Sequence, residues 1–258
     1  MGSEPVFSCS SEIWDALIVF GGSFVAGFLG AVVGLVLGSL RLPVLLLASG
    51  TPAAAAGANI AVSAAAALSG GIGHARAGRV DWGVVGWMAP PSVAGAFLGG
   101  FFGHLLPADA LLAGIAVVLA VNGLDLLLAL QAEARRTRHP AAFAAVSGLL
   151  IGALGGAVGL ILGTLRLPAL LRGVGLSAHR AVGTNLAVGF FLGVAGFLGH
   201  LARLEVEWTA LAAGLAGAIP GAWFGAWATG RLSEMLLRRA IGVALLAVSA
   251  AIGVEAAL

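Results

Sequence analysis

The chain has 258 residues, of which 60% are hydrophobic and 9% are charged, and its mean hydropathy is +1.08. A soluble domain carries about 25% charged residues, so this composition excludes a soluble globular protein and predicts a membrane protein. The net charge is only +2, and the basic residues are all arginines in short loops between apolar runs. Such a distribution orients a chain in a bilayer, so we expect lipid and no nucleic acid as a partner.

Apolar runs long enough to cross a membrane follow one another along the whole chain, since about 18 apolar residues suffice for a span. In the first half the runs cover residues 13–50, 52–73, 83–106 and 108–130. In the second half they cover 141–174, 177–201, 206–229 and 232–258. The most charged segment separates the halves. We therefore expect a first module at 13–130, a cytoplasmic linker at 131–139 and a second module at 140–258.

The first run is too long for one span. A continuous helix over residues 13–50 would reach about 57 Å at about 1.5 Å per residue, against a hydrocarbon core of about 30 Å. Gly38 and Pro43 interrupt it, because both residues punctuate helices and proline suits the first turn of a new one. We expect a helix, a break and a short return helix here, and the same arrangement at Gly159–Pro168.

The two halves are copies of one module. Residues 30–43 (GAVVGLVLGSLRLP) and 155–168 (GGAVGLILGTLRLP) are identical at ten of fourteen positions, with an offset of 125. With an offset of 126 the match continues through four further pairs: Asn59 and Asn185, His74 and His200, Trp82 and Trp208, and Gly95 and Gly221. Shared composition would not keep asparagine, histidine and tryptophan in step, so the chain contains an internal duplication.

Arginines in three segments, 74–81, 131–139 and 229–239, predict the orientation of the modules. The positive-inside rule places all three in the cytoplasm, and the acidic N-terminus and the 202–207 loop outside. A module of four plain crossings would put the first two segments on opposite sides. We therefore expect an all-α polytopic membrane protein of two inverted-topology repeats, each a broken, returning helix hairpin plus three transmembrane helices. Transporters with such repeats have their substrate site near the midplane.

Arg41 and Arg166 are the leading candidates for substrate binding, because each lies in a break and the repeat relates one to the other. An arginine at membrane depth is a functional candidate, and its planar fork of donors stays charged. A helix N-terminus beside each arginine would add backbone N–H groups. Both arginines could instead extend to lipid headgroups. Small and hydroxyl residues in the same breaks would let an oxyanion approach: Gly38, Ser39, Gly163 and Thr164.

Polar residues on the helix after each break are further candidates. Asn59, Thr184 and Asn185 could hydrogen-bond a substrate, or they could join helices within the membrane.

Three titratable residues could couple transport to protons. His74 and His200 end the same helix of each module, where they could shuttle protons or lie at the membrane interface. Asp125 lies in an apolar run without a counterpart in the second module. Its carboxyl group could relay protons, pair with Asn122 or contact a second copy of the chain.

Other chemistry has little support in the sequence. Neither histidine has the spacing of a metal site, and the chain has neither a phosphate-binding loop motif nor any lysine. We therefore expect no metal, no cofactor and no ATP-driven transport by this chain alone. No nucleophile–base set occurs, so we expect no enzymatic activity.

The ordered motifs resemble those of the sulfite exporter TauE/SafE family of bacterial inner-membrane permeases. The resemblance rests on Gly38–Pro43 and Gly163–Pro168 (Gly-x-Leu-Arg-Leu-Pro), on Ala-Val-Gly-Thr-Asn at 181–185 and on Gly-Arg-Val-Asp-Trp at 78–82. It implies a multi-pass protein of the cytoplasmic membrane that exports sulfite, sulfoacetate or related organosulfonates, and it makes a homodimer an expectation. We expect transport by alternating access, in which Arg41 and Arg166 would neutralise the charge of the anion. The alternative is a passive channel, or a permease for a different small solute.

Overall fold

The computed structural model of the chain describes residues 7–35, 38, 41, 44–45, 52–102, 116–117, 119–124, 127–128, 137–158, 163–202 and 206–255. Every element that it bounds in these residues is helical. In chain order they are α1 (Phe7–Val33), α3 (Pro52–Arg76), α4 (Trp82–Phe102), α6 (Pro140–Val158), α7 (Gly163–Pro168), the π-helix η2 (Ala169–Val174), α8 (Ala178–Ala202), α9 (Trp208–Thr229) and α10 (Glu234–Glu255).

The helix boundaries keep the period of the sequence repeat. Helices α1 and α6 end at equivalent valines, Val33 and Val158, 125 positions apart. Helices α4 and α9 begin at equivalent tryptophans, Trp82 and Trp208, 126 positions apart. Each of these tryptophans follows an acidic residue that caps the helix: Asp81 Oδ1 accepts from Val84 N, and Glu207 Oε1 accepts from Thr209 N. The duplication therefore extends to local structure.

Three helices are long and apolar enough to cross a membrane, within the described residues: Trp14–Val33, Ala178–Leu198 and Trp208–Thr229. Residues Pro140–Leu154 form a shorter apolar helix. Large hydrophobic side chains are exposed on these and neighbouring helices, as expected where lipid replaces water around a protein. They include Trp14, Phe97, Leu150, Leu198, Trp208 and Trp227. The all-helical membrane class expected from composition is confirmed.

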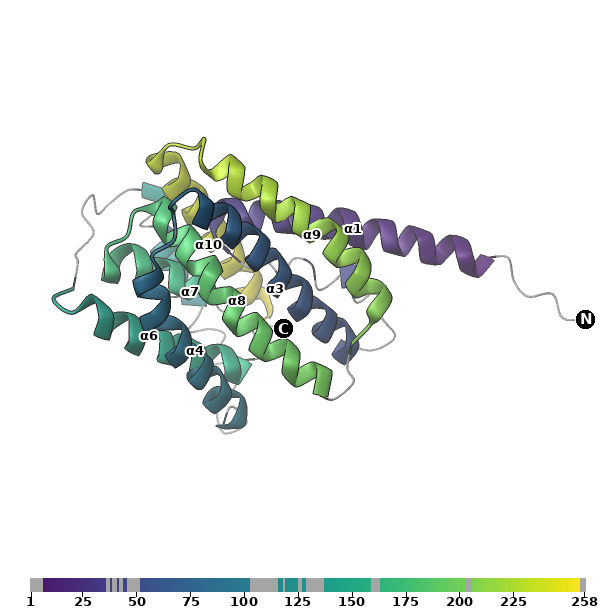
Figure 1. Cartoon of the computed structure of the whole chain (residues 1–258), viewed down its shortest axis with the longest axis horizontal. Helices are drawn as coiled ribbons and strands as arrows, with labels where there is room; N and C mark the ends of the chain where they lie inside the picture. The colour runs from purple at the N-terminus through teal and green to yellow at the C-terminus, as the bar shows by residue number, and fades with distance from the viewer. Residues whose placement is uncertain are drawn as a thin grey trace, which may run out of the picture.

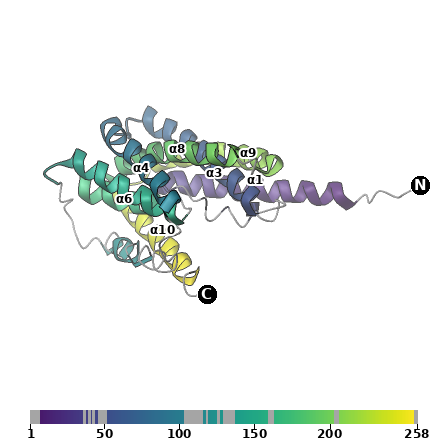
Figure 2. The same ribbon diagram turned by 90° about the horizontal axis from the view of Figure 1, so that it is seen from below.

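Each module packs its helices against the other module (Figures 1 and 2). Helix α1 lies along α9, and α6 lies along α4. Glycines make both contacts close: a Cβ at Gly221 would meet the carbonyl oxygen of Phe24, and a Cβ at the equivalent Gly95 would meet that of Leu149. Phe24 and Leu149 are themselves equivalent in the repeat. The two contacts are thus one interaction that occurs twice, each time across the modules.

The contacts of glycines also give the directions of the helices. Along α1 and α9 the contacting residues rise in number together, so the two helices are parallel: Phe20 with Gly217, Phe24 with Gly221, and Phe28 with Gly225. Along α3 and α8 one number rises as the other falls, so these equivalent helices are antiparallel: Ile60 with Gly196, Ala64 with Gly193, and Gly71 with Ala187. Helices α3 and α8 cross the centre of the bundle in Figure 1.

Candidate functional site

The two candidate arginines are buried. Arg41 is 2% exposed and Arg166 is 0% exposed, and Arg166 is among the largest fully buried side chains of the protein. Neither takes part in the ion pairs found among the described residues. A buried charge without a counter-charge is costly, so its surroundings must be arranged to hold it. The alternative of an arginine extended to lipid headgroups does not fit this burial.

Arg41 is held by α3. Its Nε donates to Oδ1 of Asn59 at 3.1 Å, and its Nη2 donates to the carbonyl oxygen of Asn59 at 3.1 Å and to Oγ of Ser63 at 2.6 Å. Nδ2 of Asn59 in turn donates to the carbonyl oxygen of Gly38 at 3.1 Å. One asparagine therefore holds both the arginine and the backbone of the first break.

Arg166 is held by α8 in the equivalent way. Its Nε donates to Oδ1 of Asn185 at 2.9 Å, and Nδ2 of Asn185 donates to the carbonyl oxygen of Gly163 at 2.9 Å. The Nη1 and Nη2 groups of Arg166 are buried and have no hydrogen-bond partner among the described residues. Within the described part of the chain, the guanidinium therefore presents two unpaired, charged donors in the interior, where each unmet donor is costly.

Asn185 also connects the two breaks. Its Nδ2 donates to the carbonyl oxygen of Gly34 at 2.7 Å, across 151 positions of sequence. Gly34 ends α1 with a positive φ of 73°. An added Cβ there would lie 2.6 Å from Cα of Val182 on α8, so only glycine allows this approach. The end of the first helix thus packs directly on the site of the second module.

Beside Arg41 lies a small pocket with about 10 Å³ of space, about enough for one water molecule. Residues of α1, α3 and α8 line it, among them Gly27, Gly30, Ser63, Ala67 and Leu186.

The expectation that Pro168 begins a helix is wrong. Helix α7 begins at Gly163, so Arg166 and Pro168 both lie inside it, and the chain continues as the π-helix η2. Proline has no N–H to bond the preceding turn, and the wider hydrogen bonding of η2 starts at the next residue. Arg166 therefore lies three residues into α7 and not in front of a helix that begins at Pro168.

The matching family model describes "Sulfite exporter TauE/SafE" and covers residues 19–252. The chain belongs to the sulfite exporter TauE/SafE family. With its apolar helices, this makes it a membrane protein of a transporter family, as its ordered Gly-x-Leu-Arg-Leu-Pro motifs indicated.

Similar curated proteins carry transporter names. A "Probable membrane transporter protein" of Xylella fastidiosa (strain Temecula1) is 32% identical over 91% of this chain and 94% of its own length. The "Probable membrane transporter protein YdhB" of Bacillus subtilis (strain 168) is 27% identical over 87% of this chain and 93% of its own length. No solved structure gives a significant match.

Of the remaining candidate residues, some are described by the structure and others lie outside the described residues. Thr164 is partly buried on α7, two positions before Arg166. Thr184 is buried, but its Oγ1 accepts from the backbone N–H of Asp81 at 2.9 Å and so joins α8 to the start of α4. Asp81 also pairs with Arg180 at 3.0 Å. Three further candidates fall outside the description: the positions of Ser39 and Asp125, and the side chain of His200.

His74 lies at the contact of α3 with α1. It is 0% exposed, and its Nε2 donates to the carbonyl oxygen of Ala31 at 3.2 Å. Its Nδ1 is buried without a hydrogen-bond partner in the described part of the chain. The same carbonyl oxygen lies 3.3 Å from Oγ1 of Thr229 on α9. His74 is therefore an interior residue at a three-helix contact.

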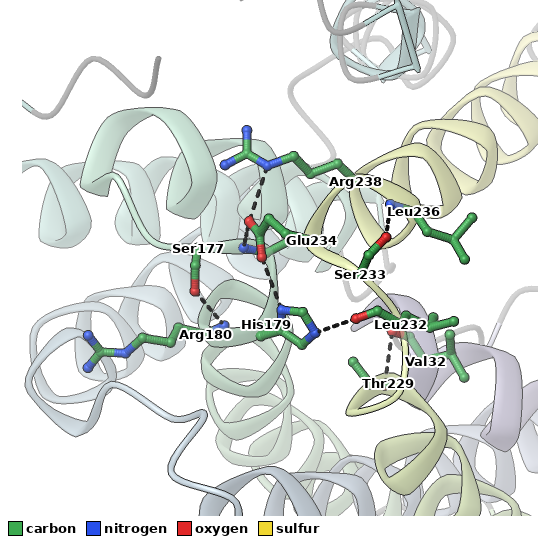
Figure 3. A network of polar contacts seen from close by, with 11 residues as sticks. Val32, Ser177, His179, Arg180, Thr229, Leu232, Ser233, Glu234, Leu236 and Arg238 are labelled. Carbon is green, nitrogen blue, oxygen red and sulfur yellow. Dashed lines mark hydrogen bonds and ion pairs between the residues drawn. The ribbon is translucent and has the colours of Figure 1, made fainter. Parts of the chain in front are cut away.

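A second polar cluster joins the start of α8 to α10, and Figure 3 shows the Glu234 carboxylate between His179 and Arg238. Its Oε1 accepts from Ala178 N at 2.6 Å and from Arg238 Nε at 3.2 Å, and its Oε2 lies 3.0 Å from His179 Nδ1. Partial burial acts to raise the pKa of Glu234, but these hydrogen bonds outweigh it and lower that pKa.

The described residues contain no group of three His, Cys, Asp or Glu that could hold a metal.

Ser63 is the site residue that the sequence analysis missed. A polar residue one helical turn after Asn59 shares its face of α3, and this spacing was the available signal.

Proposed function

We propose that the chain is a secondary transporter that exports small sulfur-containing oxyanions, such as sulfite, sulfoacetate or related organosulfonates, across the cytoplasmic membrane. Family membership supports transport and the class of substrate. The observation that carries the proposal is the pair of arginines, buried at 2% and 0% exposure and without a carboxylate partner among the described ion pairs. A membrane protein keeps such charges where they serve a substrate.

An oxyanion suits these arginines physically. A guanidinium holds its donors in a plane and matches two oxygens of a sulfonate, sulfite or carboxylate at once. The anion would supply the counter-charge that the interior lacks, and it would leave part of its own hydration shell to do so. Asn59 and Asn185 would keep both guanidinium groups in position, because each accepts from the Nε of its arginine.

The mechanism that we propose is alternating access by two inverted repeats, each a returning hairpin and three crossings. The antiparallel contact of the equivalent helices α3 and α8 supports inversion. Helix α1 of the first module packs along α9 of the second, and α6 of the second packs along α4 of the first. Such reciprocal packing fits two modules that pivot on one another. Asn185 then lies at the pivot, because it binds the backbone of both breaks.

Proton coupling is proposed for His74. Its Nδ1 has no hydrogen-bond partner among the described residues and would accept the proton, and the Nε2 bond to Ala31 would transmit the change to α1.

Flux through proteoliposomes tests the proposal. Purified wild type should release internal sulfoacetate with saturable kinetics, and external substrate should accelerate the release. Arg166→Gln and Arg41→Gln should each lower the flux by about tenfold or more, since each removes a charge-assisted contact or its support. Arg231→Gln removes an exposed arginine that stacks on Trp227 and is the matched control. A pH gradient should change wild-type flux and leave that of His74→Gln unchanged.

The alternative is a passive channel, or a permease for another small solute. A channel would show linear flux without acceleration by external substrate. Unchanged flux in both buried-arginine variants would refute the anion site.

A further inference from the structure

The two arginine sites share one construction. In both, the Nε of the arginine donates to an asparagine Oδ1, at 3.1 Å for Arg41 and 2.9 Å for Arg166. In both, the asparagine Nδ2 donates to a glycine carbonyl of the break, at 3.1 Å for Gly38 and 2.9 Å for Gly163. Duplication therefore preserved the half of each site that fixes the arginine.

The sites differ at the outer end of the guanidinium. Nη2 of Arg41 is 2.6 Å from Oγ of Ser63, whereas Nη1 and Nη2 of Arg166 have no partner in the described residues. The repeat offset of 126 explains the difference, because Gly189 occupies the position equivalent to Ser63. Both residues come four positions after their asparagine and so lie on its face of the helix. Gly189 is buried and offers no hydroxyl.

From this asymmetry, and building on the proposed anion transport, we propose that the transporter has a single anion site, at Arg166, and that Ser63 closes the equivalent place at Arg41. The anion accepts from Nη1 and Nη2 of Arg166 through two of its oxygens. Gly189 is the specificity-determining position, because its missing side chain leaves the fork open. Arg41 is a positioning residue, which holds the first break through Asn59 and Ser63.

The space around Arg41 agrees with this assignment. The pocket beside Arg41 has about 10 Å³, room for about one water molecule and too little for a sulfonate or carboxylate group. Apart from Arg41 and Ser63, the residues that line this pocket are alanine, glycine and leucine, whose side chains cannot hydrogen-bond an anion. At Arg166 the backbone of Gly163 lies close to the fork, because an added Cβ at Gly163 would lie 3.4 Å from Nη2. Since Arg166 is fully buried, the anion reaches it only when the helices part, as alternating access requires.

Exchanging the distinguishing side chain tests the inference. Sulfoacetate and sulfite binding to purified, detergent-solubilised full-length protein is measured by calorimetry, with thermal unfolding as a second readout. Gly189→Ser places a hydroxyl beside Arg166, as Ser63 stands beside Arg41, and should weaken binding by about tenfold or more while raising Tm without ligand. Gly189→Ala is the matched control: it adds the Cβ without the acceptor and should keep binding within about threefold. The wild type should bind one anion per chain.

A second pair of variants decides the matter if position 189 tolerates no side chain. Arg166→Lys keeps the charge but removes the fork, so it should weaken binding by about tenfold or more, whereas Arg41→Lys changes a positioning residue and should weaken it less. Equal losses in the two lysine variants, or wild-type binding by Gly189→Ser, would overturn the single-site assignment. A different result would refute the proposed transport itself: no release of sulfoacetate or sulfite from proteoliposomes that contain the wild type. Anion flux that Gly189→Ser does not affect would retain the transporter and reject only this inference.

Discussion

Asn185 should be the side chain on which the joining of the two breaks depends most. Asn185→Ala removes three hydrogen bonds, from Arg166 Nε and to the carbonyl oxygens of Gly34 and Gly163. A hydrogen bond to a charged group contributes about 1.5–3 kcal/mol and a neutral one about 0.5–1.5 kcal/mol, so the sum is about 2.5–6 kcal/mol. Measured values inside membranes average about 0.6 kcal/mol per bond, which sets the lower expectation at about 2 kcal/mol.

Asn59→Ala is the matched control, because it deletes the same atoms at the equivalent position. Its side chain makes two of the three bonds, to Arg41 and Gly38, and no described bond to the other module. Reversible unfolding in mixed micelles, followed by the fluorescence of the six tryptophans, should give a larger loss for Asn185→Ala. The difference should be about one hydrogen bond, or about 0.5–1.5 kcal/mol. An equal or larger loss in Asn59→Ala would refute the idea that Asn185 joins the modules.

Two further predictions concern the first break and the polar cluster of α8 and α10. Gly34→Ala should abolish folded protein, since its Cβ would lie 2.6 Å from Cα of Val182. The control Gly78→Ala, at φ 68° with nothing within 4 Å of the added Cβ, should lower the free energy of unfolding by only about 1–2 kcal/mol. Equal yields of monodisperse protein from the two variants would contradict this. The folded state lowers the pKa of Glu234. The contribution of its carboxylate to stability is therefore full above the unfolded pKa of about 4.3, and it is lost as pH falls through the lower pKa of the folded state. The carboxylate is 40% exposed, so its contribution to stability is about 1 kcal/mol or less. The Tm of wild type should approach that of Glu234→Gln as pH falls below about 4.3. A constant Tm difference over that pH range would show that the ionisation of Glu234 does not contribute to stability.

Much of the local structure followed from the repeat. Ten identities in fourteen residues, and a fixed offset afterwards, are enough to predict that α4 and α9 begin at equivalent tryptophans. The same logic selected Arg41, Asn59, Arg166 and Asn185, and the structure brings each arginine into contact with its asparagine. Their role in binding stays a prediction, since contact with one another is not contact with a substrate.

Other features could not be predicted, because they depend on contacts between segments distant in sequence. The bond from Asn185 to Gly34 crosses 151 positions, and no local pattern reports such a contact. The helix containing Pro168 was misjudged because proline usually begins or ends a helix, whereas here a switch to π-helical bonding accommodates it. Helix direction was predicted from loop arginines alone, and the contacts of α3 with α8 now supply an independent argument.

An open fork at Arg166 has a consequence for the transport cycle. In the proposed cycle, the occluded protein without an anion would contain a buried charge whose Nη1 and Nη2 have no partner among the described residues. This raises its free energy relative to any state in which water reaches these donors. With an anion the same donors are paired, and the occluded state loses that penalty. A ligand shifts a conformational equilibrium only by its differential affinity for the two states, and here the difference lies in the pairing of Nη1 and Nη2. Passage through the occluded state should therefore be faster with bound anion than without, which would explain the expected acceleration of release by external substrate. At Arg41 the hydroxyl of Ser63 already pairs Nη2, so in the proposed single-site transporter only Arg166 would make the movement depend on substrate.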